Sequence, residues 1–99
     1  MTAIGDIDAG LATAGWAISG DGRALSKRFV FADFREAMAF MVMVALEAER
    51  RNHHPDWYNS WNRVDVRLTT HDRGAITDKD VALARYMDKA SAGRLKEAD

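Results

Sequence analysis

The chain has 99 residues, a length typical of one domain with one core, so we expect residues 1–99 to form a single domain. The absence of cysteine excludes a disulfide framework and a thiolate zinc site, and 14 Lys plus Arg spread among 15 Asp plus Glu argue against binding nucleic acid through its phosphates. The sequence shows neither a secretory signal nor an apolar run near the roughly 20 residues of a membrane span, so we expect a cytoplasmic protein without membrane contact.

The first half of the chain predicts a short helix, a β-hairpin and one long helix. Residues 2–13 favour a helix that Gly15 ends. Residues 16–19 and 24–31 have the pattern of two strands, joined through glycine-containing residues 20–22. Asp33, with Glu36 three residues later, predicts a capping box at the start of a helix that runs to about residue 52, because Pro55 disfavours helical geometry at the residue before it.

Apolar residues surround this long helix instead of forming one stripe. They are Phe34, Met38, Phe40, Met41, Val42, Met43, Val44, Ala45 and Leu46. Such a pattern indicates burial on two sides of the helix. Large exposed apolar patches are uncommon on monomers, so we expect some of Val42, Met43 and Leu46 to lie in a contact between subunits.

The second half predicts another hairpin and a last helix. Residues 57–61 and 64–70 have strand character, and in the second of these strands Val64, Val66 and Leu68 point to one face. Thr77 and Asp80 predict a capping box before the last helix. The elements together predict an α+β fold, in which an antiparallel four-stranded sheet carries about three helices packed on one face.

Histidine is the side chain whose unperturbed pKa lies nearest neutrality, so the three histidines are the main candidates for acid and base chemistry. His53 and His54 are adjacent, and His71 follows the last predicted strand. Glu49 precedes His53 by four residues and would share a helix face with it if the helix reached that far. Two other interpretations remain open. Helix-ending histidines are often only caps, and three imidazoles with a water could form a zinc site, although adjacent ligands on one short turn are geometrically awkward.

The spacing of these residues resembles the motif of the pterin-4a-carbinolamine dehydratases. The motif residues, in order, are Glu49, His53-His54-Pro55, Trp61, His71 and Asp80. Further elements occur in the family's order over roughly residues 15 to 90, namely Gly15-Trp16, Phe29-Val30-Phe31, Asp33-Phe34, Thr70-His71-Asp72 and Lys79-Asp80. The resemblance implies a lyase that removes water from 4a-hydroxytetrahydropterin to give quinonoid dihydropterin, with the pterin as substrate and with neither a bound cofactor nor a metal ion.

The resemblance also implies roles for individual residues and for partners. We expect His53 and His71 to act as the acid and the base in an undecided order, His54 to orient the pterin, and Glu49 to tune or position His53. Trp16, Thr70 and Asp72 are expected to contact the substrate, although Trp16 and Trp61 would each also suit the core. Asp80 is expected to act mainly as a helix cap. Members of the family form dimers or tetramers, and their reaction takes place during the turnover of aromatic amino acid hydroxylases. The rival interpretation is a non-enzymatic assembly or coactivator module on the same fold.

Overall fold

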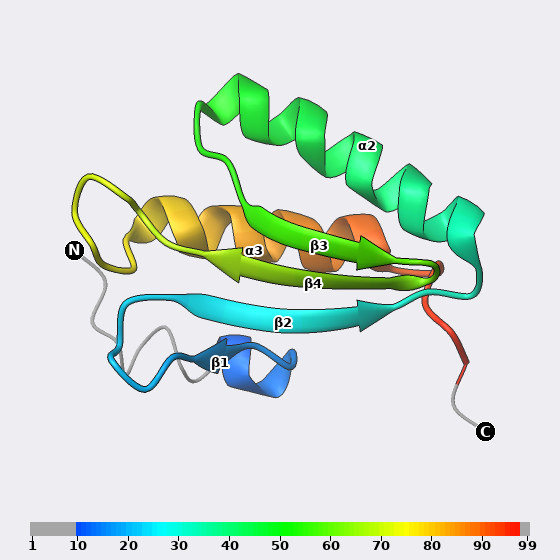
Figure 1. Cartoon of the computed structure of the whole chain (residues 1–99), viewed down its shortest axis with the longest axis horizontal. Coiled ribbons are helices and arrows are strands. Elements are labelled where there is room, and N and C mark those ends of the chain that lie inside the picture. The colour runs from blue at the N-terminus through cyan, green and yellow to red at the C-terminus, as the bar shows by residue number, and fades with distance from the viewer. Residues whose placement is uncertain (1–9, 98–99) are drawn as a thin grey trace.

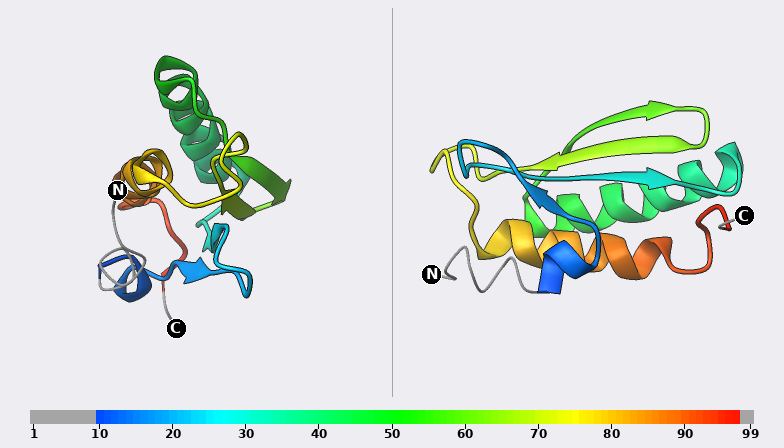
Figure 2. Two further views of the ribbon diagram at one scale, coloured as in Figure 1. Left: turned by 90° about the vertical axis from the view of Figure 1, so that its left-hand side faces the viewer. Right: turned by 90° about the horizontal axis from the view of Figure 1, so that it is seen from below.

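A four-stranded antiparallel sheet forms the centre of the computed structural model, which describes residues 10–97 (Figure 1). The strands are β1 (Ala17–Ile18), β2 (Leu25–Val30), β3 (Asp56–Ser60) and β4 (Arg63–Leu68), in the order β1-β2-β4-β3. The helices α2 (Phe34–Arg51) and α3 (Asp78–Ser91) lie on one face of this sheet together with helical residues 10–13 (Figure 2). The predicted α+β architecture is confirmed. Residues 2–9 of the first predicted helix lie outside the described part.

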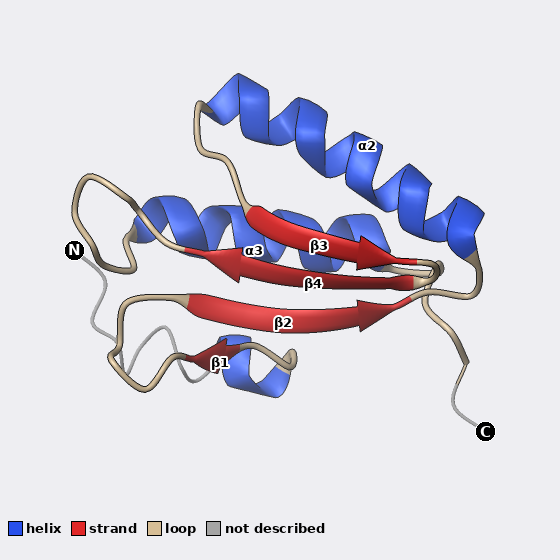
Figure 3. Ribbon diagram, viewed as in Figure 1, coloured by secondary structure: helices blue, strands red, loops and turns tan. Residues whose placement is uncertain are grey.

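The two predicted hairpins are present, and Figure 3 shows how the long helix α2 connects them. β1 pairs with β2, and β3 pairs with β4. The centre of the sheet is the pairing of β2 with β4, which aligns Leu25 with Leu68 and Phe29 with Val64. Strand side chains alternate between the two faces, so this register directs the apolar set of both central strands toward the helices.

Local capping signals place the starts of both helices. The side chain of Asp33 accepts a hydrogen bond from the backbone N–H of Glu36 at 3.0 Å, while the carboxylate of Glu36 pairs with Arg94 at 2.7 Å. The predicted capping box of α2 is therefore only half formed. The capping box of α3 is complete. The side chain of Thr77 accepts a hydrogen bond from the backbone N–H of Asp80, and the side chain of Asp80 accepts one from the backbone N–H of Thr77. Unpaired N–H groups in the first turn explain why such side chains determine where a helix begins.

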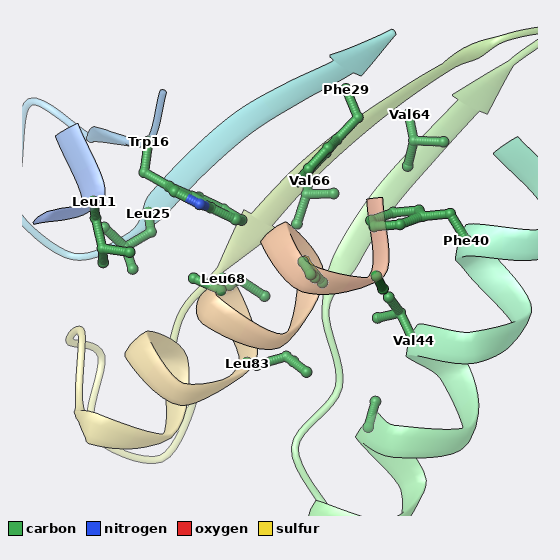
Figure 4. Close-up of a cluster of buried hydrophobic side chains, with 14 of the residues drawn as sticks. Leu11, Trp16, Leu25, Phe29, Phe40, Val44, Val64, Val66, Leu68 and Leu83 are labelled. Carbon is green, nitrogen blue, oxygen red and sulfur yellow. The ribbon is translucent and has the colours of Figure 1, made fainter. Parts of the chain in front are cut away.

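Trp16 belongs to the core, where Figure 4 shows it among the buried side chains of the sheet and helices. Its ring packs edge-on against Phe29 with centroids 5.9 Å apart, and its Nε1–H donates to Asp88 on α3 at 3.1 Å. Core packing and the partly exposed carboxylate of Asp88 account for both ends of the indole, so Trp16 has a core role in this structure, and its expected contact with the substrate stays a prediction. Trp61, by contrast, is exposed in the turn after β3 and fills no core space.

The outer side of α2 leaves apolar side chains uncovered. Val42 is 56% exposed and Leu46 is 70% exposed, whereas Met43 is partly buried, packs against the core and contacts Arg94 of the same chain. In the part of the chain that the structure describes, neither α2 nor any other helix is both apolar and long enough to cross a membrane.

Candidate active site

Three segments distant in sequence meet at one end of the sheet, at the left in Figure 1. They are the carboxyl end of α2 with the residues that follow it, the loop after β4, and the amino end of α3. The chain reverses in the loop after β4 because the N–H groups of Arg73 and Gly74 both bond to the carbonyl of Thr70, with Gly74 in a left-handed conformation. These turns bring polar residues from all three segments to one place.

A pocket of about 320 Å³ opens at this junction. Its lining residues are Asn52, His53, His54, Thr69, Thr70, His71, Asp72 and Lys79. All three histidines of the chain therefore border one cavity. Thr70, Asp72 and Lys79 also border an adjoining pocket of about 310 Å³, which Thr77 lines as well. Among the predicted site residues, Glu49 and Trp16 do not line either cavity.

The turn that ends α2 determines where His53 points. Asn52 adopts a left-handed conformation with φ 51°, and its N–H bonds to the carbonyls of Ala48 and Glu49. The N–H of His53 reaches back to the carbonyl of Ala48 at 3.0 Å. This pair of bonds is the Schellman arrangement, in which an asparagine can take the position usually held by glycine. The helix therefore stops at Arg51, and His53 turns inward toward α3.

His53 forms a buried pair with Asp80 of α3. Nε2 of His53 lies 2.6 Å from Oδ1 of Asp80, whose side chain is 0% exposed. Oδ2 of the same carboxylate accepts from the hydroxyl of Thr70 at 2.8 Å and from the backbone N–H of Thr77 at 2.9 Å. The expectation that Asp80 is mainly a helix cap is too narrow. It caps α3 and at the same time holds the imidazole of His53.

Glu49 pairs with His54 and not with His53. Its Oε1 lies 2.8 Å from Nε2 of His54, and the two side chains are 80% and 56% exposed. The predicted link between Glu49 and His53 fails because it required the helix to continue for two more residues. The left-handed Asn52 rotates His53 off the face that carries Glu49 and brings His54 within its reach.

His71 contributes an exposed imidazole to the other side of the pocket. Its side chain is 67% exposed, and its Nε2 lies 3.3 Å from Oδ2 of Asp56 on β3. Nothing in the sequence around Asp56 marks it as a partner of His71, and the contact emerges only in the folded chain. Of the residues predicted to contact substrate from this loop, Asp72 is exposed at the pocket, whereas Thr70 is buried with its hydroxyl directed at Asp80.

Each of the three histidines has a different carboxylate partner. Asp80, Glu49 and Asp56 each take one imidazole, so the rings approach the pocket with separate hydrogen-bond partners. Within residues 10–97, no three histidine or carboxylate side chains converge in the manner of a metal site. Each imidazole therefore reaches the pocket with its own carboxylate partner.

Comparison with known proteins identifies the family. The family model for pterin 4 alpha carbinolamine dehydratase matches residues 4–90. The chain belongs to this family. A relative from Rhizobium rhizogenes, described as "Putative pterin-4-alpha-carbinolamine dehydratase", is 50% identical over 92 residues, which are 93% of this chain and 89% of the relative.

Two solved structures share the fold of this pterin-4a-carbinolamine dehydratase family member. One is a transcriptional coactivator/pterin dehydratase from Brucella melitensis, with a TM-score of 0.84 and 36% identity over 92% of this chain and 98% of that one. The other is a pterin dehydratase-like protein described as a RuBisCO assembly factor, with a TM-score of 0.69 and 23% identity over 79% of this chain and 90% of that one. The second likeness shows the common fold alone.

Proposed function

We propose that the protein dehydrates 4a-hydroxytetrahydropterin to quinonoid dihydropterin. The observation that carries this proposal is the pocket in which His53, held by buried Asp80, and His71 stand in a chain of the dehydratase family. A protein whose only role is to bind other proteins through its surface does not need a buried histidine–carboxylate pair beside a polar cavity. The buried His53–Asp80 pair therefore favours the enzyme over the assembly or coactivator alternative. The product is the form of pterin that is reduced again for aromatic amino acid hydroxylases, which we propose as the functional partners.

The proposed reaction needs two proton transfers. The C4a–OH bond breaks as the leaving oxygen accepts a proton and departs as water, and a ring N–H loses its proton as the C=N bond forms. Two imidazoles in opposite protonation states can perform both transfers. We assign these roles to His53 and His71, with His54 and Asp72 orienting the pterin. Glu49 would act on the substrate through His54, its hydrogen-bond partner. No cofactor enters the scheme, because the pterin is itself the substrate.

The direct test is a dehydration assay on the purified protein. We expect it to accelerate the loss of water from 4a-hydroxytetrahydropterin without added metal, and to keep its rate in the presence of a chelator, because every proposed proton transfer uses a side chain. A rate equal to that of the spontaneous reaction would refute the enzyme. Loss of activity on chelation alone, restored by zinc, would establish the metal mechanism instead.

We further propose that the protein forms a homodimer or homotetramer through the outer side of α2. The support is the uncovered apolar surface around Val42 and Leu46. We no longer expect Met43 to contribute much, since it packs within its own chain.

Replacing Leu46 with aspartate is expected to shift the protein toward monomer, because the contact would then bury an unpaired carboxylate. Light scattering at micromolar concentration measures the mass, and Leu46→Met, which keeps an apolar side chain, is the matched control. A wild-type protein of monomer mass would contradict the interface.

A further inference from the structure

Two threonine hydroxyls lie behind the His53–Asp80 pair, on the side away from the imidazole. Oγ1 of Thr70 is 2.8 Å from Oδ2 of Asp80, and Oγ1 of Thr77 is 2.6 Å from Oγ1 of Thr70. Thr70 is buried in the loop two residues after β4, whereas Thr77 caps α3. A continuous row of hydrogen bonds therefore joins the cap of α3 to the imidazole at the pocket.

The direction of each hydrogen bond in this row follows from the number of hydrogens. A hydroxyl has one hydrogen, and a carboxylate oxygen only accepts, so the hydrogen of Thr70 points to Asp80. Thr70 must then accept from Thr77. The oxygen of Thr77 already accepts the backbone N–H of Lys79 at 3.3 Å, which leaves its own hydrogen for Thr70. Every bond runs the same way, toward the buried carboxylate.

The carboxylate in turn determines which nitrogen of His53 carries hydrogen. Oδ1 of Asp80 can only accept, so Nε2 of His53 is the donor across the 2.6 Å contact. Among the described residues, the only buried side-chain nitrogen or oxygen without a hydrogen-bond partner is Nε of Arg63. Within residues 10–97, no hydrogen-bond partner holds Nδ1 of His53, and Nδ1 is not among the buried unpartnered atoms, so it is accessible at the pocket that His53 lines.

We propose that Thr70 and Thr77 are positioning residues that hold His53 in the Nε2–H tautomer, so that Nδ1 is the nitrogen that exchanges the proton with the substrate. Thr70 thus acts through Asp80 rather than by touching the pterin. Loss of its hydroxyl would leave Oδ2 with the single N–H donor of Thr77 and free the carboxylate to rotate away from His53. The consequence for turnover rests on the proposed dehydratase function, whereas the tautomer is a property of the free protein.

The tautomer can be read from ring ¹⁵N chemical shifts of the wild-type protein without substrate, at a pH high enough for the imidazole of His53 to be neutral. We expect Nε2 to be of the protonated type and Nδ1 of the unprotonated type. The opposite assignment, or an even mixture, overturns the proposal whatever the activity of the protein. This measurement needs no variant and no substrate.

Variants then test the threonines. Thr70→Val keeps the volume of the side chain but removes the hydroxyl, and we expect a mixed tautomer and a kcat reduced by about 10-fold to 100-fold, the effect of one hydrogen bond to a charged group. Thr70→Ser, which keeps a hydroxyl, should have the wild-type Nε2–H tautomer and the wild-type kcat. Thr77→Val should shift the tautomer in the same direction but less.

The matched control is Ser91→Ala, which removes a buried hydroxyl from the far end of α3, where it donates to the carbonyl of Asp88 at 3.0 Å. It should leave the tautomer and kcat unchanged. If Thr70→Val keeps a pure Nε2–H ring and the wild-type kcat, the hydroxyl row has no positioning role. If the wild type has no dehydratase activity but the tautomer of His53 changes in the threonine variants as expected, the proposed function fails and the positioning role of the hydroxyl row is supported.

Discussion

Replacing His53 with alanine is expected to lower kcat by about 10²-fold to 10⁴-fold, the usual loss when one positioned acid or base is removed. The structure supplies the reason, since His53 is the histidine whose ring a buried carboxylate holds at the pocket. Steady-state dehydration rates under saturating pterin measure the effect. His71→Ala should cause a loss of the same order, because two groups share the proton transfers.

The control for His53→Ala lies at the same end of α2. Arg50→Ala removes an exposed side chain whose hydrogen bonds go to Glu47 and not to the pocket, so kcat should not change. His53→Ala leaves Oδ1 of Asp80 without its donor, so some stability is lost, and rates must be compared at a temperature where circular dichroism shows both variants folded. A folded His53→Ala and a folded His71→Ala that both keep the wild-type kcat would reject the assignment.

Replacing Asp80 with alanine is expected to reduce stability and activity together. The substitution removes the acceptor of three hydrogen bonds from His53, Thr70 and Thr77, in a place where its side chain is fully buried. Removing one partner of such a buried pair commonly costs about 3 kcal/mol or more. The free imidazole then loses its orientation, and kcat should fall by about 10-fold to 100-fold, the equivalent of a hydrogen bond to a charged group. Denaturant unfolding and the dehydration assay measure the two effects.

Asp33→Ala separates the capping role of Asp80 from its role at the site. Asp33 is the N-cap residue of α2, where its side chain accepts a hydrogen bond from the backbone N–H of Glu36. It lines neither of the two pockets at the histidines, so its removal should cost about 1 kcal/mol and leave kcat unchanged. If Asp80→Ala behaves like Asp33→Ala, with a small loss of stability and full activity, Asp80 is only a cap.

Local chemistry made much of the fold predictable from sequence. The pattern of residues 64–68 marks a strand with one buried face, and the caps Asp33 and Thr77 stand at the helix starts where the sequence places them. These features depend on neighbours within a few residues, which is why periodicity and capping rules find them. The motif resemblance likewise identified the three histidines, which the structure brings to one pocket.

Tertiary structure decided which residues pair within that pocket. The spacing of Glu49 and His53 predicted a shared helix face, but one left-handed residue, Asn52, ended the helix and exchanged the partners. Asp80 lies 27 positions from His53, and no periodicity connects residues so far apart.

The same limit explains why the contacts of Trp16 and Thr70 within the protein could not be predicted. Trp16 has an apolar ring with one polar atom, which suits a ligand wall and a core equally well. Its contacts with Asp88 and Phe29 decide for the core, and the contact with Asp88 exists only after α3 has packed against the sheet. The sequence by itself determined the elements and the chemical groups of the site. Their pairing depends on the orientation of side chains across packed elements, which distance along the chain does not encode.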